Sequence, residues 1–225
     1  MNEPETQVWL SDCYTNSKHI AFYDCEEPED FKGFVDGLRD GKPLTPEQLP
    51  TKIWPADMRN AERGQRVKRI RDFACIQGGV MVVSPMVAAL FREFDLGFAD
   101  DEGSGARRVR LHPIEQLTAE DGRLVGQLFL FHVATEKDSL ILRPSNGVTL
   151  KETKKGLRAR IRPVGQVSLN LSPESLIGPD IWREKRLSGP ILFSNRLVRA
   201  MHDAKIREIS FQPCVIADAP NGTNA

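Results

Sequence analysis

The sequence predicts an α+β fold in which two related strand–helix–strand modules pack with a central, largely antiparallel β-rich segment. Three observations lead to this prediction: a segment that occurs twice without a gap, a region of apolar runs bounded by turn residues, and a hydrophobic content of 40% over 225 residues. A chain of this length and composition can bury a core without disulfide or metal support.

The first observation is an internal repeat. GGVMVVSPMVAALFREFDL (78–96) aligns without a gap with SGPILFSNRLVRAMHDAKI (188–206), and Ser84 falls on Ser194. In each copy a short apolar run precedes the serine, and apolar residues then recur at helical spacing. This order of features predicts a strand followed by an amphipathic helix in both copies.

Both copies continue into a strand-like segment, RVRLHPI in the first and REISFQPCV in the second. The modules therefore span 78–114 and 188–215. A serine between a strand and a helix is typical of an N-cap, so we expect Ser84 and Ser194 to be structural helix caps. The sequence leaves open whether the two strands of a module are parallel neighbours.

Strands are also predicted between the modules, over 123–170. RLVGQLFLFHVA and SLILRP are apolar runs bounded by turn residues, and apolar and basic residues alternate in LRARIR. Asn146 and Gly147 separate SLILRPS from VTL, and this dipeptide favours a tight hairpin turn. We therefore expect a hairpin at this point.

The N-terminal part predicts a different organisation. A first strand is expected at 7–14 and a short helix near 28–39, where apolar residues recur at helical spacing. The segment 43–55 is rich in proline and reads as an ordered connector. We divide the chain into 1–55, with the strand, helix and connector, and 56–216, with both modules. Residues 217–225 are expected to form a disordered tail.

Charge is balanced overall and segregated locally. The 31 basic and 31 acidic residues cancel, which argues against nucleic acid as the main partner. The segment 24–40 is acidic, whereas 59–71 and 151–162 each carry six bases and one acid. These runs are solvated surfaces or electrostatically marked binding surfaces. No apolar run is long enough for a membrane span and no signal peptide is evident, so we expect a cytoplasmic protein.

No motif predicts catalysis, a metal or a cofactor. Ser194 lies in LFSNRL, which lacks the flanking glycines of a nucleophile elbow. The four cysteines form no C-x-x-C pair and are expected to be free thiols. The residues with metal-compatible side chains cluster near the N-terminus without zinc-like spacing: Asp12, Cys13, His19, Asp24 and Cys25. Anion binding at the helix starts after Ser84 and Ser194 stays open as an alternative.

The C-terminal segment GPDIWREKRLSGPILFSNRLVRAMHDAKIREISFQP resembles the signature of a bacterial immunity protein family of polymorphic toxin systems, immunity family eleven. The pattern is a turn with an aspartate and an aromatic residue, an apolar strand, a serine, an amphipathic helix and a closing strand. It is met by Gly178, Asp180, Ile181, Trp182, Ser194, Leu197, Phe211 and Pro213. The resemblance covers about 55–215. Relatives carry an Asp-rich turn and a serine after the middle strand, of which Asp138 and Ser139 are present here.

The resemblance implies a non-enzymatic immunity protein, a monomer or homodimer, that binds and neutralises a cognate protein toxin. It brings no catalytic residue, cofactor or metal. Because opposite charges speed protein association, charged or aromatic residues in the acidic segment, the connector and the loop at 98–108 are candidate contacts. They are Glu26, Glu27, Glu29, Asp30, Trp54, Asp100, Asp101 and Glu102. The alternative is an anion- or small-ligand-binding regulator, or an enzyme, that uses the helix N-termini at Ser84 and Ser194.

Overall fold

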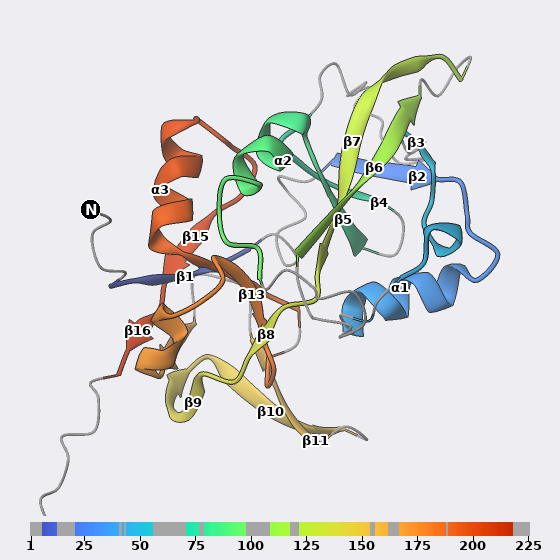
Figure 1. The fold of residues 1–225 in the computed structure, drawn as a ribbon. Coiled ribbons are helices and arrows are strands. Elements are labelled where there is room, and N and C mark those ends of the chain that lie inside the picture. The colour runs from blue at the N-terminus through green and yellow to red at the C-terminus, as the bar shows by residue number, and fades with distance from the viewer. Residues whose placement is uncertain are drawn as a thin grey trace, which may run out of the picture.

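The computed structural model of the protein is built mostly from strands, with three α-helices among the described residues (Figure 1). The described residues are 6–12, 21–40, 42, 44–55, 71–76, 79–97, 109–117, 122–153, 156–161, 167–187 and 189–217. The predicted mixture of helices and strands is thereby confirmed at the level of fold class. The predicted tail beyond Ala217 and the loop at 98–108 lie outside the described residues.

Six strands form a closed barrel, which the sequence did not predict. Their order is β2 (Ala21–Cys25), β3 (Lys52–Pro55), β6 (Val109–Leu117), β7 (Leu124–Val133), β5 (Val80–Val83) and β4 (Phe73–Ile76). The β2–β4 and β3–β6 pairs are parallel, and the other described pairs are antiparallel. A closed barrel pairs every strand on both sides and leaves no free edge.

Apolar residues at alternating strand positions fill the barrel, since successive side chains of a strand point to opposite faces. Ile53, Val82 and Leu130 are among them, each at most 1% exposed. Helix α1 (Phe31–Asp40) adds Phe34 to the same core, with Phe31, Val35 and Leu38 packed around it. The helix predicted near 28–39 is confirmed, and its apolar stripe faces the barrel core.

A second sheet pairs the first described strand of the chain with strands from beyond residue 180. Its order is β15 (Phe211–Pro213), β1 (Val8–Ser11), β14 (Ile191–Ser194), β13 (Ile181–Glu184) and β8 (Glu136–Lys137). Strand β1 lies between β14 and β15 and is antiparallel to both. Strands from the segment 1–55 therefore belong to both sheets, and the division of the chain at residue 55 stays a prediction.

The remaining strands form a three-stranded sheet, β16 (Val215–Ile216), β12 (Ser168–Leu171) and β9 (Leu140–Asn146), and a two-stranded ribbon, β10 (Val148–Thr153) and β11 (Gly156–Ile161). Short 3-10 helices are η1 (Pro46–Gln48) and η3 (Pro173–Leu176). The predicted hairpin between β9 and β10 is wrong. Gly147 does turn the chain, with φ at 72°, but β9 pairs with β12 and β10 pairs with β11.

Helices α2 (Pro85–Phe91) and α3 (Asn195–Asp203) join the barrel to the second sheet (Figure 1). Phe91 of α2 lies with its ring centroid 5.3 Å from Phe131 of the barrel and 6.2 Å from Phe193 of the second sheet. These rings belong to one apolar core that both helices cover. The packing of α2 and α3 therefore fixes the second sheet against one outer side of the barrel.

Each predicted module contains a strand, a helix and a strand in that order: β5–α2–β6 and β14–α3–β15. The two strands of a module are parallel but not neighbours. Strand β7 separates β5 from β6, and β1 separates β14 from β15.

Candidate functional site

The Asp180 carboxylate lies at the centre of the segment that carries the sequence signature. It is buried and accepts hydrogen bonds from the Ser194 hydroxyl and from the Arg196 guanidinium, whose Nε and Nη2 atoms lie 2.6 and 2.7 Å away. The backbone N–H of Asp95 donates a further hydrogen bond at 2.8 Å. A bidentate guanidinium and several further donors are the arrangement that a buried carboxylate requires.

Asp180 also sets the geometry of its surroundings. Strand β13 begins directly after it and pairs with β14, and the Ser194 N–H donates to the Asp180 carbonyl at 2.9 Å. Ser194 is the N-cap of α3, because its Oγ accepts from the Leu197 N–H at 3.3 Å. One aspartate thus connects the start of a strand, the cap of a helix and the end of another helix.

The first module has the same arrangement around Asp72. Strand β4 begins directly after Asp72 and pairs with β5, and the Ser84 N–H donates to the Asp72 carbonyl at 3.1 Å. The Ser84 hydroxyl donates to the Asp72 carboxylate at 3.3 Å and accepts from the Val87 N–H, which makes Ser84 the N-cap of α2. The aligned serines are therefore paired with aspartates that the sequence alignment did not include.

The two arrangements also exchange contacts. The Asp180 carboxylate binds the N–H of Asp95, which follows α2, and the Asp72 carboxylate binds the N–H of Arg207, which follows α3, at 3.2 Å. Each aspartate thus holds the serine cap of its own module and the segment after the helix of the other module. This exchange couples α2 and α3 to both sheets.

These contacts argue against the alternative that Ser84 or Ser194 acts as a nucleophile or that the helix starts after them bind an anion. Ser84 and Ser194 are 5% and 6% exposed, so both residues are largely buried. Both hydroxyls already bind the carboxylates of Asp72 and Asp180. A carboxylate of the chain therefore lies beside each helix start, where it would repel a second anion.

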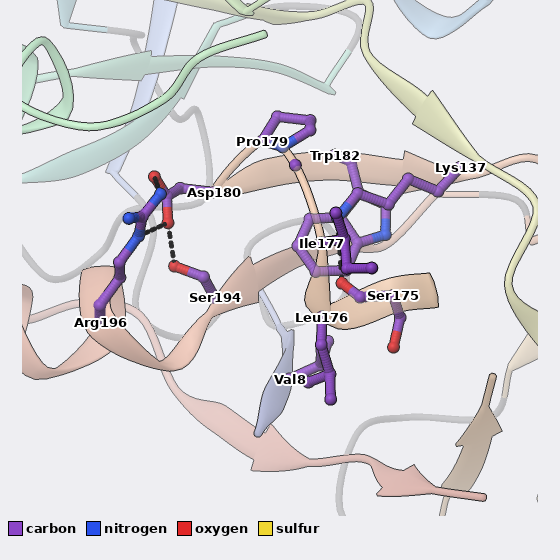
Figure 2. Close-up of a pocket in the computed structure, with 11 residues that line it drawn as sticks. Val8, Lys137, Ser175, Leu176, Ile177, Pro179, Asp180, Trp182, Ser194 and Arg196 are labelled. Atoms are coloured by element: carbon purple, nitrogen blue, oxygen red, sulfur yellow. Dashed lines mark hydrogen bonds and ion pairs between the residues drawn. The ribbon is translucent and has the colours of Figure 1, made fainter. Parts of the chain in front are cut away.

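A pocket of about 310 Å³ opens beside Asp180 (Figure 2). Asp180, Ser194 and Arg196 lie on one side of it, and Trp182 and Lys137 lie on the other. The wall is completed by apolar residues of β1, of η3 and of the segment after η3, namely Val8, Leu176, Ile177 and Pro179. The lining mixes charged and apolar side chains, and the carboxylate on its wall already binds Ser194 and Arg196.

The opposite wall rests on β8 and β13. The Lys137 ammonium lies 3.6 Å from the centroid of the Trp182 ring and donates to the Ser175 carbonyl at 3.0 Å. The buried Glu184 carboxylate accepts from the N–H and the hydroxyl of Ser139 at 2.9 and 2.8 Å. Burial raises the pKa of Glu184, and the two hydrogen bonds from Ser139 oppose that shift.

Asp138 and Ser139 are the two residues that the resemblance related to an Asp-rich turn. Both bind β13 or the turn after it, since Ser139 holds Glu184 and Asp138 forms an ion pair with Arg186 at 2.7 Å. Their contacts are structural. Glu184, Lys137 and Arg196 were not singled out from the sequence, because their partners lie on other elements.

Residues 113–215 match the model of an immunity protein family, Imm11. The chain therefore contains an Imm11 domain, and the family resemblance expected from the signature is confirmed. Asp180, Ser194, Arg196 and the whole pocket except Val8 lie within the Imm11 match. No curated protein matches the chain.

The expected contact residues lie outside the Imm11 match. Glu26, Glu27 and Glu29 are exposed in the connection from β2 to α1, and Trp54 is half-buried on β3. Asp30 is exposed too, but its carboxylate accepts from the Gly33 N–H at 2.8 Å at the start of α1. Asp100, Asp101 and Glu102 lie outside the described residues.

The described residues contain no group of three metal-binding side chains, and no described helix has the length and apolar character needed to cross a membrane. Of the candidate metal cluster, Cys13 and His19 lie outside the described residues. Burial raises the pKa of Cys25 to about 11 and of Cys75 and Cys214 to about 12, so these thiols stay protonated and unreactive.

Proposed function

We propose that this protein is a non-enzymatic immunity protein that neutralises a cognate protein toxin by direct contact in the cytoplasm. The single observation that carries the proposal is the Imm11 domain at 113–215, because membership of an immunity protein family implies toxin neutralisation. The buried, engaged hydroxyls of Ser84 and Ser194 support a structural role for the two residues that an enzyme would have used.

Co-expression with the product of the neighbouring gene tests the proposal, because an immunity gene is expected to lie beside the gene of its toxin. Cells that express the toxin should survive only when this chain is present, and the two proteins should co-purify. An unrelated toxin, expressed in the same way, is the control and should kill regardless of this chain. Death of cells that carry both the neighbouring toxin and the folded chain would contradict the proposal.

We infer that the acidic segment contributes to the contact with the toxin. Glu26, Glu27 and Glu29 are exposed, and their combined reversal to lysine should weaken protection. Asp30 is left unchanged in this variant, because its carboxylate caps α1 and its reversal would also damage the helix. Full protection by the triple variant would exclude the acidic segment. The loop residues Asp100, Asp101 and Glu102 remain alternative contacts.

We also infer that the two modules are copies of one structural unit. The paired aspartate and serine in each, Asp72 with Ser84 and Asp180 with Ser194, support this inference, as does the exchange of contacts after α2 and α3. The unit then starts at the aspartate rather than at the apolar run. As a monomer or homodimer, the protein would use this unit as scaffold and other surfaces for recognition.

A further inference from the structure

One outer face of the barrel is left uncovered by the described elements. Some side chains of β6 and β7 point away from the barrel interior. In the half of the two strands that starts at Val109 and ends at Val133, here called the lower half, these outer side chains include Val109 and Phe131. They pack under α2 and α3 in the core shared with the second sheet. The same face continues along the upper half of both strands to Glu115 and Gln127, which are opposite each other and exposed. In Figure 1 the upper ends of β6 and β7 rise beyond the other labelled elements.

Strands β3 and β2 extend this face. Ile53 and Tyr23 point into the barrel core, so their neighbours Trp54 and Asp24 point outward. Asp24 and Trp54 are cross-strand partners, and Lys52 of β3 is the partner of Glu115 of β6. Asp24, Trp54 and Glu115 therefore lie on adjacent strands of one surface, which we name the β3 face together with Glu26, Lys52 and Val125.

The β3 face combines acidic and apolar groups. It carries three carboxylates, on Asp24, Glu26 and Glu115, and the ammonium of Lys52, while the exposed Arg123 lies two residues before Val125 at its margin. Val125 is 51% exposed, and Leu124 beside it is 60% exposed. Trp54 is half-buried. Exposed apolar side chains near a tryptophan and a rim of like charges are typical of an interaction surface.

We propose that the β3 face is the surface that receives the cognate toxin, and that the toxin presents a basic surface to it. The proposal rests on the proposed function and names the contact surface and the chemistry of its partner. The excess of carboxylates favours a partner with lysine or arginine around an apolar centre, because opposite charges steer the encounter and set specificity. The proposal also places Trp54 and Glu26, which are far apart in the sequence, on one surface.

The test uses the full chain and the toxin identified by co-expression and co-purification, in an inactive form, with binding measured by calorimetry. Glu115→Lys and Val125→Lys should each raise the Kd for the toxin at least tenfold, since both place a cation on the β3 face. Glu93→Lys and Leu150→Lys are the matched controls. Glu93 is exposed beyond α2, and Leu150 on β10 is 52% exposed, nearly the same as Val125. Both controls should stay within threefold of the wild type.

The possible failures are distinct. If the wild-type chain does not bind the toxin, the proposed function is wrong and this assignment falls with it. If it binds and all four variants bind equally well, the function stands and the β3 face is excluded. Hydrogen exchange gives a second readout, in which toxin should slow exchange in β3 and upper β6–β7. A toxin-free dimer that Val125→Lys dissociates would overturn the proposal in favour of a second copy of this chain.

Discussion

At the scale of single residues, Asp180 shows how one buried charge can organise distant segments. Its carboxylate binds Ser194 and Arg196 near the C-terminal end of the chain and the N–H of Asp95, which lies 85 residues earlier. The signature in the sequence includes Asp180 and Ser194, so a role for both could be predicted. The contact with Asp95 could not, because no local pattern relates residues on separate elements.

Replacement of Asp180 by asparagine should lower the free energy of unfolding by about 2–4 kcal/mol, because it leaves the guanidinium of Arg196 without its carboxylate partner. The low end of this range applies because the Arg196 side chain is 46% exposed and partly solvated. Urea denaturation measures the change. Asp72→Asn should cost less, since the described contacts of Asp72 include no guanidinium. Equal losses would contradict this account.

The lowered pKa of His132 leads us to expect that the stability of the folded protein depends on pH. Burial, aided by repulsion from His112, Arg110 and Arg183, lowers the pKa of His132 from 6.5 to about 4. Between these values the unfolded chain takes up a proton and the folded chain does not. The contribution of the neutral His132 imidazole to the free energy of unfolding is therefore fully present above pH 6.5. As the pH drops to 4, the free energy of unfolding falls by roughly 3 kcal/mol.

His132→Leu should reduce the loss of stability between pH 7 and pH 5, measured by urea denaturation at each pH. His112, whose pKa burial also lowers, should account for part of what remains. His202→Leu is the control, since the His202 side chain is 90% exposed. An unchanged pH dependence in His132→Leu would show that the imidazole is solvated in the folded protein.

At the scale of elements, the helices and the strands differed in how well the sequence predicted them. Helix α1 was predicted from the spacing of Phe31, Phe34 and Leu38, which is a local property of the chain. The predicted hairpin at Gly147 was wrong, although the chain does turn there, because strand pairing depends on partners elsewhere in the chain. Strand β9 finds β12 across the sequence, and the ribbon of β10 and β11 leaves in another direction.

The two helix caps give a matched pair of substitutions. Ser84→Ala should cost about 1 kcal/mol, the usual value for a lost N-cap. Ser194→Ala should cost about 2 kcal/mol, because it removes the cap and a hydrogen-bond donor from the buried Asp180 carboxylate. Ser84→Ala also removes a donor, but from the half-buried Asp72 carboxylate, which water can solvate in its place. Thermal and urea unfolding should rank the two variants in this order. The reverse order would contradict the central role assigned to Asp180.

At the scale of the whole molecule, the Imm11 match and the folded unit do not coincide. The match at 113–215 includes β13, β14 and β15 but not β1, which lies between β14 and β15. It also includes β7 and most of β6 but none of β2, β3, β4 and β5 of the barrel. The sequence could not indicate this, because periodicity predicts a strand without naming its neighbours.

A fragment of residues 113–215 should therefore fail to fold on its own. Circular dichroism should show no cooperative thermal transition for the fragment and a cooperative one for the full chain. Deletion of β1 alone should also strongly lower the free energy of unfolding of the full chain, because Val8 and Leu10 belong to the core of the second sheet. A cooperative transition in the isolated fragment would show that the Imm11 region is an independent domain.

The position of β1 also has a consequence for synthesis. Trp9 of β1 donates its indole N–H to Asn195, 186 residues later. At a translation rate of about 5–20 residues per second, β1 leaves the ribosome roughly ten to forty seconds before its partner strands exist. During that interval an apolar strand waits unpaired while the barrel strands emerge. The second sheet can close only after β14 and β15 have been synthesised, so a chain terminated before them would expose β1 to aggregation and to proteases.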